Sequence, residues 1–166
     1  MDALTLGIGL LAIAACILPF ILISRANKIH DQQLRDTLLK MATQHGLTVT
    51  EYDIWHQNII GLDANRRALL IHRATETTVQ DQVIRLEDVK QCRKVEEHHS
   101  RQEDGQLVKI PTHLGLEFSL KQSPSAIIYL SFYEEVEGHF LNGESPLLQK
   151  WHQRITQLLP GYKLAA

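Results

Sequence analysis

The strongest constraint on the fold is an apolar segment near the N-terminus. Residues 3–24 contain no charged side chain, and their only ionisable group is the thiol of Cys16. A helix of this length, at a rise of about 1.5 Å per residue, extends about 33 Å and matches a hydrocarbon core of about 30 Å. Pro19 would break a soluble helix, but it is tolerated in a membrane-spanning one. The segment therefore predicts a transmembrane anchor over residues 1–25.

Two other interpretations of this segment are less favoured. Ile13–Cys16, IAAC, resembles a bacterial lipobox, but a signal peptide needs a basic n-region and residues 1–7 contain no Lys or Arg. Cleavage before Cys16 would also leave an apolar stretch, ILPFILIS, at the new N-terminus. The remaining alternative is a buried core helix, but the segment is long for one and has no polar face.

Lys and Arg residues follow the apolar segment and do not precede it. Arg25 and Lys28 come directly after it, followed by Arg35 and Lys40. Basic residues near the ends of a span favour the cytoplasmic side. The sequence therefore predicts a single-pass protein of the bacterial inner membrane, with residues 25–166 in the cytoplasm.

Charge and cysteine content exclude several classes of protein. The chain has 17 basic and 19 acidic residues, so no strongly basic surface points to nucleic acid. The two cysteines, Cys16 and Cys92, cannot form the dense disulfide framework of a small secreted domain. This content fits a reducing compartment.

Residues 26–46 follow the apolar segment and predict a juxtamembrane helix. Leu34, Leu38 and Met41 recur at helical spacing, and Gly46 is a suitable C-terminal stop. Their stripe has two ways to become buried. It could pair with a second copy of the chain, or it could fold back on the domain that follows, which is the favoured interpretation.

From Thr48 onward the apolar period changes from helical spacing to two, which is typical of strands. Asp63 and Asn65 predict a hairpin turn because their side chains bond nearby backbone groups. Val83, Leu86 and Val89 are three residues apart, so a helix is the alternative in that region. We expect seven strands, covering residues 48–56, 59–62, 68–73, 78–86, 88–97, 115–122 and 126–136.

The C-terminal part predicts an amphipathic helix. Ser145 is a suitable N-cap and Pro146 a suitable first helical residue, and Pro160 ends the helix. The buried stripe is expected to comprise Leu147, Leu148, Trp151, Ile155 and Leu158.

The complete pattern predicts an α+β fold. About seven antiparallel strands would form a bent sheet or partial barrel, and the C-terminal helix would cap it, with Trp151 sealing the core. This order resembles pleckstrin-homology-like domains, and the chain resembles small bacterial single-pass membrane proteins that carry one. The resemblance implies a domain over residues 47–160 with a tail over 161–166, an anchored topology and no activity. The segments that carry it are EYDIWHQNIIGLDANRRALLI, IRLEDVKQCRKV, LGLEFSLK, IIYLSFYE and LNGESPLLQKWHQRI.

Three arginines are candidates for an interaction site. Arg66 and Arg67 lie at the predicted hairpin turn, and Arg73 lies on the strand that follows. Basic residues near the first hairpins of pleckstrin-homology domains can hold lipid phosphates. However, Asp63 shares this turn, and no cluster of four or more basic residues marks a headgroup site. The alternative is that the arginines at the turn are simply exposed.

The histidine-rich segment EEHHSRQED invites a metal interpretation. Glu96, Glu97, His98 and His99 lie together, and a hairpin would bring His113 back toward them. Zinc takes His and carboxylate ligands, but adjacent residues of a strand face opposite sides. A solvated, charged hairpin tip is therefore favoured.

No pattern predicts nucleophilic catalysis or a cofactor. GxSxG and Gly-rich phosphate-binding motifs are absent from the sequence. Cys92 lies between Lys90 and Arg93, which could lower the pKa of its thiol, although a small apolar filler on a strand is favoured. The sequence therefore assigns no catalytic, cofactor-binding or metal-binding residue.

These observations favour a membrane-anchored, non-enzymatic interaction or scaffold module whose partner is another membrane-associated protein. Folds of this type expose a sheet edge and loops that can bind peptides or proteins. One alternative is a structural membrane protein that self-associates through Leu34, Leu38 and Met41. The other is a metal-dependent hydrolase at the histidine-rich hairpin.

Overall fold

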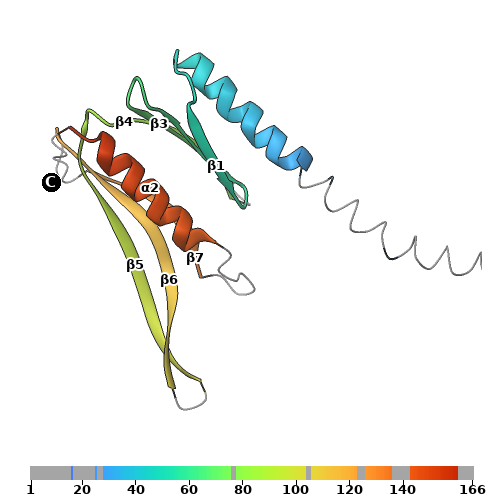
Figure 1. Ribbon diagram of the computed structural model, residues 1–166, viewed down its shortest axis with the longest axis vertical. Helices are drawn as coiled ribbons and strands as arrows, with labels where there is room; N and C mark the ends of the chain where they lie inside the picture. Colours follow the sequence, from blue (N-terminus) through green and yellow to red (C-terminus); the bar gives the residue numbers. More distant parts are fainter. Residues whose placement is uncertain are drawn as a thin grey trace, which may run out of the picture.

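The computed structural model describes residues 16, 25, 28–75, 78–103, 106–122, 126–135 and 143–160. Within these residues a helix over residues 28–44 precedes seven strands and a C-terminal helix, α2 (Figure 1). The strands are β1 (Glu51–Trp55), β2 (Asn58–Asp63), β3 (Ala68–Ala74), β4 (Val79–Arg85), β5 (Val89–Glu103), β6 (Gln106–Leu120) and β7 (Ile127–Glu134), and α2 covers Glu144–Leu158.

The strands form two antiparallel sheets and not the single bent sheet or partial barrel that the sequence predicts. One sheet has the order β1-β2-β3-β4, and the other has the order β5-β6-β7. The chain leaves β4 and enters β5 through a tight turn, in which the N–H of Asp88 donates to the carbonyl of Arg85 at 3.0 Å. β4 pairs with β3 and β5 pairs with β6, and the described strands β4 and β5 do not pair with each other, so the sheets separate at this turn. Residues 78–97, for which a helix was the alternative, are largely strand, and the α+β character holds.

The main core lies between the two sheets and α2. Trp151 of α2 and Phe118 of β6 are fully buried there, together with residues such as Leu69 of β3. α2 contacts β5, β6 and β7, while the indole Nε1 of Trp151 donates a 2.9 Å hydrogen bond to Asp53 of β1. One helix therefore joins both sheets, and the prediction that Trp151 seals the core is confirmed.

α2 begins earlier than its sequence predicts. Its N-cap is Gly143, with a φ of 92°, and not Ser145. Glu144 becomes the first helical residue and is buried, with its carboxylate 2.8 Å from Nε2 of His56. A negative charge at this position complements the positive end of the helix dipole. Tertiary pairing of Glu144 thus outweighs the local capping preference of Ser145.

The helix over residues 28–44 packs on the face of the first sheet that points away from the main core (Figure 1). Its buried residues Leu34, Leu38 and Met41 contact Ile59 of β2 and Leu70 of β3 in a second apolar cluster. Both faces of β2 and β3 are therefore covered, and each strand has five consecutive buried residues. The fold-back packing is the one that the structure shows, so the stripe expected for self-association is covered within one chain.

The prediction of a single-pass membrane protein is corrected. Within the described part of the chain, no helix is long and apolar enough to cross a membrane. The helix over residues 28–44 has a buried stripe and an exposed polar face, which is the pattern of a helix lying on a sheet. The predicted anchor over residues 1–25 lies outside the described residues, apart from Cys16 and Arg25, and so does the predicted tail over residues 161–166.

Asp63 joins the end of this helix to the β2–β3 hairpin. Its carboxylate accepts hydrogen bonds from the N–H of Thr48 at 2.7 Å and from the N–H of Arg66 at 2.9 Å. Burial raises the pKa of Asp63. The backbone N–H groups of Thr48, Arg66 and Asn65 and the charge of Arg66 lower it, and their combined effect is larger, so the pKa of Asp63 lies below the usual value. The turn expected from Asp63 is confirmed, and its carboxylate also holds the start of the sheet.

We expect Gly61→Ala to lower the free energy of unfolding by about 1–3 kcal/mol, the usual range for overpacking. A Cβ at residue 61 would lie 2.7 Å from Cδ2 of Leu38, which is fully buried. Urea unfolding measures the change, and the double variant Gly61→Ala/Leu38→Ala should cost less than the two changes added together. Combining Gly61→Ala with Leu148→Ala, in the other core cluster, should be additive. Equal coupling in both pairs would contradict the contact.

We expect Asp63→Asn to lower the free energy of unfolding at neutral pH by about 1–3 kcal/mol, because one of two part-buried hydrogen bonds to a charged acceptor is lost. The folded-state pKa is below the unfolded value near 3.8. The stabilisation is therefore complete above that value and lost as the pH falls through the folded pKa. Unfolding measured from pH 7 to pH 2 should show a shallower acid slope for Asp63→Asn, while the exposed control Asp36→Asn keeps the wild-type slope. Parallel slopes for all three proteins would refute this role.

Candidate functional site

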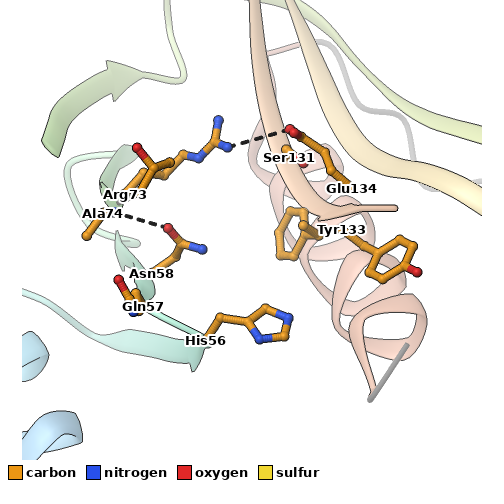
Figure 2. Close-up of a pocket in the computed structure, with 10 residues that line it drawn as sticks. His56, Gln57, Asn58, Arg73, Ala74, Ser131, Tyr133 and Glu134 are labelled. Carbon is orange, nitrogen blue, oxygen red and sulfur yellow. Dashed lines mark hydrogen bonds and ion pairs between the residues drawn. The ribbon is translucent and has the colours of Figure 1, made fainter. Parts of the chain in front are cut away.

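A cavity lies between the end of β7 and the open end of the β2–β3 hairpin, where β2 begins and β3 ends. Its volume is about 390 Å³, which falls in the range of about 300–1,000 Å³ typical of ligand pockets. Its walls come from the β1–β2 turn, from the start of β2 and end of β3, and from β7 (Figure 2). The lining residues are His56, Gln57, Asn58, Arg73, Ala74, Thr75, Ser131, Phe132, Tyr133 and Glu134. We call this hollow the β7 cavity.

The first-sheet wall is held by local hydrogen bonds and by α2. Asn58 lies opposite Arg73 in the β2–β3 register, and its Oδ1 accepts a 3.3 Å hydrogen bond from the N–H of Ala74. His56 has a φ of 50°, the left-handed conformation that tight hairpin turns require. Since His56 also pairs with Glu144, the turn that borders the cavity is tied to the first turn of α2.

The β7 wall contains a bulge. Tyr133 pairs with Leu114 and Ser131 pairs with Gly115, so Phe132 is the extra residue between them. A bulge turns successive side chains toward the same side and bends the strand. As a result Phe132 and Tyr133 are both buried in the main core, and the Phe132 ring stacks on Trp55 with centroids 4.7 Å apart.

Arg73 supplies the positive charge of the cavity. Its Nη2 lies 3.7 Å from Oε1 of Glu134, which is longer than a hydrogen bond, and Glu134 is half exposed. The Nε of Arg73 is buried and has no hydrogen-bond partner among the residues that the structure describes. Buried donors without an acceptor are uncommon in folded proteins, and this one belongs to a residue that lines the cavity.

Tyr129 of β7 does not line the cavity, but it is close enough to Arg73 and Glu134 to respond to their charges. Burial and the negative charges of Glu134 and Glu97 raise its pKa, against smaller lowering effects of Arg73 and of a hydrogen bond with Ser131. The Tyr129 hydroxyl therefore keeps its proton at neutral pH. Its side chain covers Gly115, where a Cβ would lie 2.5 Å from the hydroxyl oxygen. Tyr129 is thus a neutral hydroxyl near the charged pair of Arg73 and Glu134.

β7 is an edge strand that borders this cavity. It pairs with β6 on one side only. Over the described ranges, no backbone hydrogen bond joins β7 to a strand other than β6. Residues 131–134 line the cavity opposite the β2–β3 hairpin, so an open strand edge and a hollow lie side by side (Figure 2).

The structure separates the three arginines predicted as an interaction site. The Arg66 side chain donates to the carbonyl of Gly46, where it satisfies the end of the preceding helix. Arg67 is exposed at the turn with a φ of 50°. Arg73 lies at the opposite end of β3 from the turn. Six residues of strand separate it from Arg67, which corresponds to about 20 Å at a rise of about 3.3 Å per residue. Only Arg73 belongs to the β7 cavity.

The histidines of this hairpin contact glutamates. Glu97 and His113 lie opposite each other in β5 and β6, with 3.4 Å between Oε2 of Glu97 and Nδ1 of His113. His99 contacts Glu135 at 3.2 Å. In the part of the chain that is described, no group of three or more His, Cys, Asp or Glu residues could hold a metal ion. The structure therefore offers no described site for the metal-dependent hydrolase considered from the sequence.

Several cavity residues could not be recognised from the sequence. His56, Asn58, Ser131 and Glu134 belong to no motif, and only the fold brings them together. One charged pair, side-chain amides and two aromatic rings suit the reversible binding of a polar group beside an apolar one. Comparisons with models of protein families, with curated proteins and with solved structures found no match.

Cys92 is a buried core residue and not a reactive thiol. Burial raises its pKa to about 12, the reverse of the lowering that Lys90 and Arg93 suggested.

We expect Cys92 in a Cys16→Ser background to resist iodoacetamide at pH 8, because pH 8 is about four units below this pKa and only about one thiol in ten thousand is ionised. Mass spectrometry measures the labelling, and urea should restore it. The reciprocal Cys92→Ser variant should label at the exposed Cys16 without urea, and fast labelling of folded Cys92 would contradict its burial.

Proposed function

We propose that this protein is a non-enzymatic interaction module that binds an extended segment of another protein along the open edge of β7. The observation that carries this proposal is the position of an unpaired strand edge beside a cavity of about 390 Å³. Added strands gain affinity from main-chain hydrogen bonds and specificity from pockets for alternate side chains. We also propose that residues 47–160 are related to pleckstrin-homology-like domains, because seven antiparallel strands precede one core-packed helix.

The described sheets have four edge strands, β1, β4, β5 and β7, and a comparison of β4 with β7 supports binding at β7. β4 begins with the exposed residues Val79, Gln80, Asp81 and Gln82, and charged or polar side chains are one means of protecting an edge against pairing. β7 has the sequence IIYLSFYE, without Lys, Pro or Asp. An edge of this composition is suited to accept another strand.

β7 is also held ready for a partner. Its residues 130–133 are all buried, so the strand is fixed by the core before any peptide arrives. Binding to a fixed strand orders only the peptide, which lowers the entropic cost of association. The exposed Ile127 and Tyr129 at the start of β7 add apolar contact area.

The test is to select linear peptides of about ten residues, the upper end of strand lengths, from a displayed library on the full chain. Amide hydrogen exchange then locates the bound peptide. We expect slower exchange in residues 127–134 and unchanged exchange in β4, because the peptide supplies new partners to the β7 backbone. N-methylation of alternate peptide residues should abolish binding in one register only.

A matched pair of variants separates the cavity from the rest of the surface. Gln57→Trp places a bulky ring at the cavity, and Gln82→Trp places the same ring on the exposed face of β4. We expect about tenfold weaker peptide binding, about 1.4 kcal/mol, for Gln57→Trp only. Protection outside β7, equal effects of both changes, or selection of no binding peptide would each reject the proposal.

A further inference from the structure

We infer that the β7 cavity recognises a carboxylate of the bound peptide through Arg73. This inference rests on the proposed function and goes beyond it by naming the chemistry of the group that enters the cavity. The carboxylate can belong to an Asp or Glu side chain or to the C-terminus of the partner, since both present the same two oxygens.

The first argument is the unused donor of Arg73. Its Nε–H is buried and has no acceptor among the described residues. The Nε–H and one Nη–H of a guanidinium point the same way and match the two oxygens of a carboxylate. Here the Nη2 of Arg73 lies 3.7 Å from the carboxylate of Glu134. This distance is too long for a hydrogen bond, so Glu134 is a neighbour of the guanidinium and does not occupy its donors.

The second argument is that Glu134 is a weak competitor. Its side chain is 50% exposed, and ion pairs with exposed partners contribute little to stability. Because the Nε of Arg73 is buried, an incoming carboxylate reaches both Nε and Nη2 only after the guanidinium rotates toward the cavity. It then satisfies the donor that Glu134, at the rim, does not. Exchange of one carboxylate for another also leaves the net charge next to Arg73 unchanged.

The third argument is the remaining lining of the cavity. The Oδ1 of Asn58 is occupied by the N–H of Ala74, which leaves the Asn58 amino group to donate, and Figure 2 shows it on the cavity side. Phe132 lines the cavity from β7. Removing water beside an aromatic wall strengthens a charged hydrogen bond.

The charge of the cavity selects a singly charged group. Among the described residues that line the cavity, Arg73 is the one Lys or Arg, and Glu134 supplies a negative charge nearby. A phosphate, which carries close to two negative charges, would face Glu134 with only one arginine to compensate. A carboxylate needs no second cation.

A first experiment needs no peptide. The Nε–H signal of Arg73 is followed by NMR in the full ¹⁵N-labelled chain during titration with sodium acetate, with sodium chloride at equal ionic strength as the control. We expect a saturable downfield shift for Arg73 and none for the exposed Arg67. No shift, an equal shift with chloride, or a larger shift with inorganic phosphate would overturn the inference.

A second experiment uses the selected peptides. Peptides with a free C-terminus or an internal Glu are compared with their amidated or Gln forms, which identifies the source of the carboxylate. We expect about tenfold weaker binding of the carboxylate form to Arg73→Lys, which keeps the charge but loses the fork, and tighter binding to Glu134→Gln. Unfolding midpoints of both variants check that they are folded, and the acetate titration of the wild-type chain does not depend on either.

The outcomes distinguish this inference from the proposed function. Peptides that protect β7 but bind equally well as amides, and equally to Arg73→Lys, would refute carboxylate recognition and leave the module intact. An acetate shift at Arg73 with no peptide bound at β7 would support the carboxylate site and refute the peptide-binding module.

Discussion

The structure depends on one buried contact, the packing of Trp151 between the two sheets. Its ring is fully buried, and its indole N–H reaches Asp53 on β1, so a single side chain ties the edge of the first sheet to a helix that lies on the second. Aromatic residues bury about 150–250 Å² each and dominate core energetics. The pairing of Glu144 with His56 repeats the same connection at the start of α2. Together these contacts fix the distance between the β1–β2 turn and β7, and therefore the width of the cavity.

The cavity combines features that a stable core would normally avoid. A bulge at Phe132 disturbs the β6–β7 ladder, the buried Nε of Arg73 lacks a described acceptor, and β7 leaves its outer edge unpaired. Each of these costs stability on its own. They meet at the β7 cavity, beside the main core. Local departures from good packing on a rigid support are typical of binding sites.

The individual elements were largely predictable because their determinants are local. Alternating apolar residues predicted the second part of β6, residues 115–120, but not its extension back to Gln106. Asp63 marked the β2–β3 turn because its carboxylate bonds the N–H of Arg66. The start of α2 was not predictable, since Glu144 is drawn into the helix by His56, 88 positions earlier along the chain. The cavity was not predictable for the same reason. Of the three arginines proposed from the sequence, only Arg73 reaches it.

The sequence by itself determined which residues are apolar at strand or helix spacing, and therefore the antiparallel α+β character, the buried stripe of α2 and the burial of Leu34, Leu38 and Met41. These properties follow from periodicity, which is a property of neighbouring residues. Tertiary structure alone decided that this stripe folds onto β2 and β3, with Gly61 making room for Leu38. It also decided that the strands divide into two sheets, and that Asn58, Arg73 and Glu134 share one hollow. Such outcomes depend on contacts between segments far apart in the chain. A local pattern of apolar residues shows that a side chain will be buried, but it does not specify which distant residue that side chain will contact.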